Sequence, residues 1–181
     1  MNTISKKTGL TFGYMLIAYY VVVNLLTFLI DYTQFVKAPL TVINMVVILI
    51  LGISCIWITK RRLNNEITFK EGFSAYFIMI VVGFLANYIT QYILFNYVNP
   101  EAKIVNNEYM LELTRTISQD LEIPADEFNN KLQEMSQNPD GNFSFKTLFY
   151  NYAQAVLGSS IIGLIISLTF RNKSEFSTLQ R

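Results

Sequence analysis

Residues 8–30 read TGLTFGYMLIAYYVVVNLLTFLI, a run of 23 residues without a charged side chain. A helix rises about 1.5 Å per residue, so this run is about 35 Å long and can cross a hydrocarbon core of about 30 Å with some tilt. The run is too long for the apolar core of a signal peptide, and no small-residue cleavage site follows it. It therefore predicts a retained transmembrane helix.

Three further charge-free runs follow, at residues 38–59, 72–98 and 147–170. Thr68 and Glu71 precede the third run at the spacing of a capping box, in which each side chain satisfies an amide at the start of a helix. The sequence therefore predicts an all-α fold. Residues 1–181 form a single membrane domain in which four spans make a helical bundle.

Residues 101–146 differ from the rest of the chain because they are polar and acidic, with nine acidic residues against four basic ones. Asn99 and Pro100 fit the N-cap and first turn of a helix. Apolar residues then recur at helical spacing, at Met110, Leu113, Ile117 and Leu121. A second short helix is predicted over residues 124–137. The segment is thus predicted to be an acidic two-helix insertion between the third and fourth spans.

The basic residues predict the orientation of the chain in the membrane. Nine of the 14 Lys and Arg residues lie in segments that share one side of a four-span protein, namely residues 1–7, 60–71 and 171–181. Segments rich in Lys and Arg stay in the cytoplasm. Both termini are therefore predicted to be cytoplasmic, and the insertion is predicted to be extracytoplasmic, which in a bacterium is the periplasm.

Six amide side chains interrupt the apolar spans, all in the half of each span nearer the insertion. They are Asn24, Asn44, Asn87, Gln91, Asn151 and Gln154. The favoured interpretation is hydrogen bonding between helices, worth about 0.6 kcal/mol per contact. The alternative is a polar cavity, open to the outside, that holds a lipid head group or a small solute.

The fourth span also carries small residues at intervals of four, namely Ala155, Ser159, Gly163 and Ser167. Such a row allows another helix to approach closely. Packing within the same bundle is the favoured interpretation. Contact with a second copy of the chain or with a partner subunit is the alternative.

Several function classes are excluded by the residue inventory. The chain has no histidine, and its one cysteine, Cys55, lies in an apolar run, so zinc sites of Cys and His and catalytic triads that need His cannot form. No span contains an ionisable Asp, Glu, Lys or Arg, which argues against ion-coupled transport. No basic patch with aromatic residues indicates nucleic-acid binding. The sequence thus predicts a protein that is not an enzyme, with no catalytic, cofactor-binding or metal-ligating residues.

Two motifs carry a resemblance to a known family. Residues 67–73, ITFKEGF, stand at the start of the third span, and Asn99-Pro100-Glu101 opens the long polar loop before the last span. With four spans, this layout resembles the domain-of-unknown-function 4199 family over about residues 8–170. Those proteins are small multi-pass membrane proteins found mainly in Bacteroidetes. The resemblance implies a bacterial inner-membrane location and the family fold, and it carries no activity.

The leading hypothesis is a non-enzymatic accessory or scaffold subunit of the inner membrane that presents the acidic module to the periplasm. Its partners would be the lipid bilayer and a protein or second copy bound through the fourth span or residues 101–146. The alternative is a protein that binds or transports a small solute or lipid through the six amide residues. An enzyme acting on lipid at the outer interface ranks third.

Overall fold

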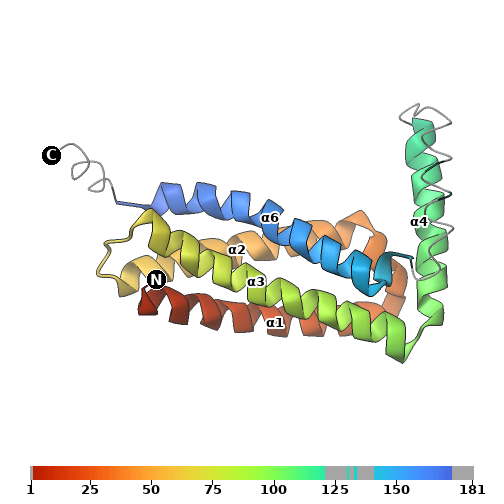
Figure 1. The fold of residues 1–181 in the computed structure, drawn as a ribbon, viewed down its shortest axis with the longest axis horizontal. Coiled ribbons are helices and arrows are strands. Elements are labelled where there is room, and N and C mark those ends of the chain that lie inside the picture. Colours follow the sequence, from red (N-terminus) through yellow and green to blue (C-terminus); the bar gives the residue numbers. More distant parts are fainter. Residues whose placement is uncertain (1, 121–129, 131–132, 134–140, 173–181) are drawn as a thin grey trace.

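The computed structural model describes residues 2–120, 130, 133 and 141–172. Four long helices lie side by side in one bundle (Figure 1): α1 Thr3–Asp31, α2 Ala38–Arg62, α3 Phe69–Ile93 and α6 Phe145–Phe170. All four are long and apolar enough to cross a membrane. The prediction of an all-helical chain with four spanning helices is confirmed for the described residues, and it makes this a multi-pass membrane protein.

Local sequence signals place the helix ends. Thr68 and Glu71 form the predicted capping box: the Glu71 amide donates to Thr68 Oγ1 at 3.3 Å, and the Thr68 amide donates to Glu71 Oε2 at 3.1 Å. Ser144 caps α6 by accepting the Thr147 amide at 3.2 Å. Because α6 starts at Phe145, Lys146 belongs to this helix rather than to the insertion.

The closest helix pair is α1 with α3. Gly9 lies against the backbone of α3, where an added Cβ would be 2.5 Å from the Ala75 carbonyl oxygen. Leu16, Met79 and Ile80 fill the interior between the helices and are fully buried. The other two long helices flank α3, and α6 has the smallest buried share of the four. The α1–α3 pair is thus the centre of the bundle, and α2 and α6 pack against it.

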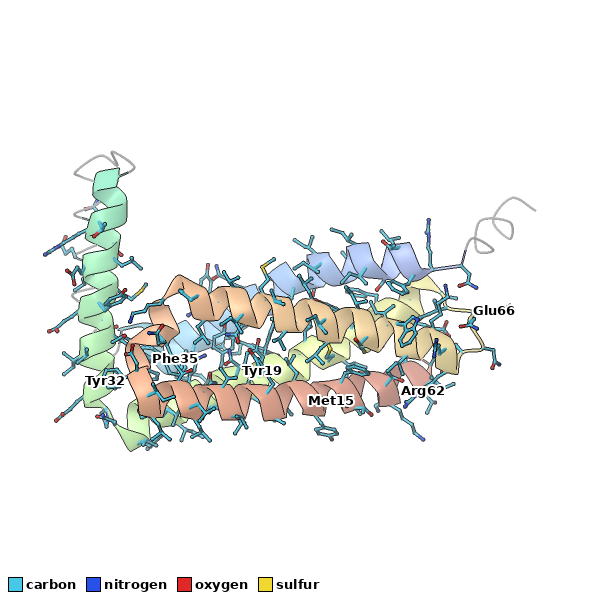
Figure 2. All side chains as sticks on the ribbon, turned by 180° about the vertical axis from the view of Figure 1, so that it is seen from behind. Met15, Tyr19, Tyr32, Phe35, Arg62 and Glu66 are labelled. Carbon is cyan, nitrogen blue, oxygen red and sulfur yellow. The ribbon has the colours of Figure 1, made fainter. Side chains whose placement is uncertain are left out.

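A fifth helix, α4 (Glu101–Asp120), runs across one end of the bundle, transverse to the four long helices (Figure 1). We call this the α4 end, and we call the opposite end, with Lys60, Arg61, Arg62, Lys70 and Arg171, the basic end. Two short helices complete the α4 end: η1 (Tyr32–Val36) joins α1 to α2, and η2 (Leu94–Val98) extends α3. Figure 2 shows Tyr32 and Phe35 of η1 beside α4.

Aromatic packing holds the α4 end together. The Phe95 ring stacks on the Phe143 ring, with 3.6 Å between centroids, and Phe143 belongs to the one-turn helix η3 (Gly141–Phe143) that leads into α6. Asn96 Nδ2 donates to the Phe143 carbonyl at 3.0 Å. The chain thus leaves and re-enters the bundle at one place.

The structure shows one helix of the predicted insertion. α4 begins at Glu101, directly after the Asn99-Pro100 start signal. The second predicted helix, over residues 124–137, falls outside the described residues except at 130 and 133. The acidic two-helix insertion therefore stays a prediction.

Candidate functional site

A polar cavity of about 480 Å³ lies between α2, α3 and α6, in the half of the bundle nearer α4. Four of the predicted amide residues line it: Asn44 from α2, Asn87 and Gln91 from α3, and Asn151 from α6. Its volume falls within the range of about 300–1,000 Å³ that is typical of small-ligand sites. The structure therefore brings together on one cavity residues that lie far apart in the sequence.

A fifth amide, Asn24 of α1, does not line the cavity and donates hydrogen bonds to Asn87, which does. Asn24 is 3% exposed, and its Nδ2 donates to Asn87 Oδ1 at 2.9 Å and to the Asn87 carbonyl at 3.2 Å. Gln91 Nε2 donates to the same Asn87 oxygen at 3.1 Å. A buried amide needs such partners because leaving it unpaired in an apolar environment costs free energy. The predicted hydrogen bonding between helices is thus what Asn24 does.

The other cavity amides keep hydrogen-bonding capacity. Asn44 Oδ1 accepts from the Tyr19 hydroxyl at 2.8 Å, and Figure 2 shows Tyr19 between α1 and α2. Among the described residues, none bonds to Asn44 Nδ2, Gln91 Oε1, or the side chains of Asn151 and Ser159. The cavity wall therefore offers both donors and acceptors from neutral groups.

Gln154, like Asn24, does not line the cavity. It is exposed on α6. Asn151, Ala155, Gly158 and Ile162 mark the face of α6 that lines the cavity. At 100° per residue, Gln154 is rotated well away from the centre of that face. Its amide therefore points to the surroundings of the bundle.

The row of small residues on α6 divides between two environments. Ala155 and Ser159 line the cavity. Gly163 and Ser167 are buried against α3, where Gly163 lies directly on the Tyr76 ring and Ser167 lies beside Gly72. Gly163 and Ser167 thus pack within the bundle, which is the interpretation favoured from the sequence. Ala155 and Ser159 instead border the open space of the cavity.

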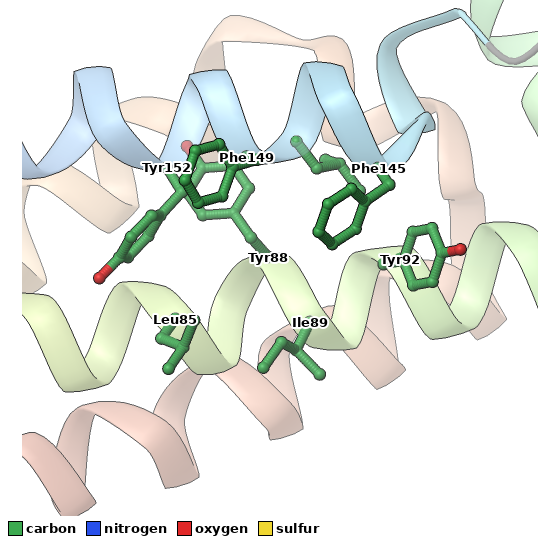
Figure 3. Close-up of a pocket in the computed structure, with 8 residues that line it drawn as sticks. Leu85, Tyr88, Ile89, Tyr92, Phe145, Phe149 and Tyr152 are labelled. Atoms are coloured by element: carbon green, nitrogen blue, oxygen red, sulfur yellow. The ribbon is translucent and has the colours of Figure 1, made fainter.

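An apolar groove of about 90 Å³ lies between α3 and α6 on the face away from α2 (Figure 3). Its walls are aromatic and aliphatic only: Leu85, Tyr88, Ile89, Tyr92, Phe145, Leu148, Phe149 and Tyr152. The rings of Tyr88 and Tyr152 meet edge to face at 6.2 Å, and Tyr88 also lines the polar cavity. Spacing along the sequence gave no signal for the groove, because its two walls come from different helices.

No group of three or more His, Cys, Asp or Glu side chains suited to a metal ion occurs among the described residues. The lining of the cavity consists of amides, hydroxyls and apolar groups. Hydrogen bonding and packing, rather than ionic contacts, are what these groups supply.

Comparison with known proteins gives one result. A family model described as "Protein of unknown function (DUF4199)" matches residues 7–172. No curated protein and no solved structure matches the chain.

Proposed function

The chain belongs to the DUF4199 family, as its motifs predicted, and from this premise we propose that it binds a small uncharged polar ligand in the cavity between α2, α3 and α6. The family description assigns no activity, so the proposal depends on the geometry. The observation that carries it is a set of amide and hydroxyl groups that line one cavity between apolar helices and keep a donor or acceptor without a partner among the described residues. The ligand is a free solute or the uncharged polar part of a lipid.

The chemistry of the wall sets the class of ligand. An ion moved into a low-dielectric site needs a charge partner. Asn44, Gln91, Asn151 and Ser159 provide none, whereas they match hydroxyl and amide groups well. A ligand that makes hydrogen bonds of about 0.5–1.5 kcal/mol each to three of them gains about 1.5–4.5 kcal/mol.

The test is native mass spectrometry of the protein released from lipid nanodiscs. We expect the wild-type protein to retain a small molecule and Asn151→Leu to retain at least about tenfold less, which corresponds to 1.4 kcal/mol. Gln154→Leu removes an amide three residues further along the same helix, outside the cavity, and should retain the wild-type amount.

Equal retention in the two variants would contradict the proposal. The mass of the retained molecule distinguishes the two sources: a lipid mass that exchanges with the nanodisc lipids indicates a head group, and a smaller mass indicates a free solute.

An accessory-subunit role is the second candidate, and the surface of α4 favours it. Glu101, Glu108 and Glu112 are exposed on one side of this helix, together with Ile104 and Val105. Such a mixed acidic and apolar face suits a protein with a basic rim. In this proposal the α4 end is periplasmic and both termini are cytoplasmic at the inner membrane, supported by the concentration of Lys and Arg at the basic end.

Charge reversal tests the accessory role. A cross-linker that cannot cross the inner membrane is applied to intact spheroplasts, and the adducts of the protein are identified. We expect a stoichiometric adduct that is lost when Glu101, Glu108 and Glu112 are all replaced by Lys. Glu66→Lys, an exposed acid at the basic end, is the control and should leave the adduct unchanged. An adduct that survives the triple reversal would contradict this role.

A further inference from the structure

The direction of α4 is set by the protein itself. Lys103 Nζ donates to Asn96 Oδ1 at 3.0 Å, and Asn96 in turn bonds the Phe143 carbonyl, so the first turns of α4 are tied to η2 and η3. Ala102 is 1% exposed in the same aromatic cluster. The helix therefore crosses the end of the bundle in a defined orientation (Figures 1 and 2). Since the four long helices run along the membrane normal, α4 lies parallel to the membrane plane.

One side of α4 faces the bundle. Ala102 and Asn106 are both buried at its start, and Lys37 Nζ lies 5.4 Å from the centroid of the Tyr109 ring, one turn further on. Positions separated by four, three and four residues share one side of a helix. Leu113 follows at the next such step, so it is on the side that faces the bundle.

The bundle does not extend under the whole helix. The C-terminal part of α4 passes beyond the edge of the four long helices (Figure 1). For a helix that lies parallel to the membrane, the side that faces the bundle is also the side that faces the bilayer around it. At 100° per residue, Glu108 is turned about 130° from the centre of that side and Glu112 is turned about 100° from Leu113, and both acids are exposed.

We propose that the C-terminal half of α4 rests on the bilayer surface, with Leu113 directed into lipid and Glu112 directed into water. Interfacial helices bury their apolar side about 5–10 Å into the boundary between head groups and acyl chains. The occupant of this side is lipid because the helix lies in the membrane plane at the end of the spans. The proposal is independent of any ligand in the cavity.

Site-directed spin labelling tests this placement. Single cysteines are introduced as Leu113→Cys and Glu112→Cys in a Cys55→Ala background, since Cys55 is the chain's one cysteine. The labelled proteins are reconstituted into vesicles of phosphatidylcholine and phosphatidylglycerol. Oxygen concentrates in lipid and a nickel chelate stays in water, so we expect a several-fold higher oxygen-to-nickel collision ratio at 113 than at 112.

Two results would overturn the proposal. A ratio at 113 equal to that at 112 would place this side of α4 in water. A label at 113 that is shielded from both reagents would show that protein covers it. If the label disturbs folding, Leu113→Trp in a Trp57→Phe background gives the same information: brominated acyl chains should quench its fluorescence, and absence of quenching overturns the placement.

Discussion

Replacing Gly163 with alanine is expected to lower the free energy of unfolding by about 1–3 kcal/mol, the usual cost of overpacking a filled core. An alanine Cβ at this position would collide with the Cδ1 and Cε1 atoms of Tyr76. Tyr76 is 0% exposed, so its ring has no solvent to move into. Larger residues at 163 should cost more.

The ring cannot move toward α2 either. On that side Tyr76 lies on Gly52, where an added Cβ would be 2.5 Å from its Cε2 atom. The Tyr76 ring is thus held between Gly52 of α2 and Gly163 of α6. A larger side chain at position 163 therefore forces α6 away from α3 at the contact between Gly163 and Tyr76.

Thermal or denaturant unfolding in detergent micelles measures this effect. Gly158→Ala is the matched control, because Gly158 is on the same helix and an added Cβ meets nothing within 4 Å. We expect that variant to be as stable as the wild type or slightly more so, since alanine favours a helix over glycine by about 1 kcal/mol or less. A second change, Tyr76→Leu, should recover part of the stability of Gly163→Ala. An equal loss of stability in Gly158→Ala and Gly163→Ala would contradict the role of the Tyr76–Gly163 contact.

The second large effect is expected at Ser159, one turn before Gly163. There a larger side chain should reduce ligand retention and leave the stability of the protein nearly unchanged. Ser159→Phe adds a ring that points into a cavity of about 480 Å³ rather than into packed side chains. We expect stability to change by less than about 1.5 kcal/mol, because open space accepts the ring. We expect the retained ligand to fall at least about tenfold, since the ring takes its place and removes a hydroxyl.

Native mass spectrometry and unfolding of the same preparations test both parts. Ile161→Phe is the control: Ile161 is two residues away on the same helix, and its side chain is 61% exposed on the outside of the bundle. It should change neither quantity. A Ser159→Phe protein that keeps its ligand would rule out this cavity as the binding site. One that unfolds like Gly163→Ala would show that Ser159 is packed.

Much of the fold was readable from the chain. Charge-free runs identified the four spans because a helix in lipid satisfies its own backbone, so the requirement is local and shows in every span separately. Thr68 with Glu71, and Asn99 with Pro100, marked helix starts for the same reason: caps act within a few residues of each other. Charge counts also separated the acidic segment from the spans.

The candidate site was only half readable. The amides of Asn24 and Asn151 are equivalent in the sequence, yet Asn24 is closed off by Asn87 and Asn151 faces an open cavity. Ser159 and Gly163 belong to one row of small residues, yet Gly163 lies against the Tyr76 ring of α3 and Ser159 lines the cavity. These differences depend on the side chain that arrives from another helix.

By itself, then, the sequence determined the number, type and approximate limits of the helices that cross the membrane, because hydrophobic length and capping are properties of consecutive residues. Tertiary structure alone decided that α2 and α6 leave a polar cavity beside α3, that Tyr19 pairs with Asn44, and that α4 lies across the end of the bundle. Helix rotation and crossing are set by packing between distant segments, and residue spacing along one segment does not carry that information.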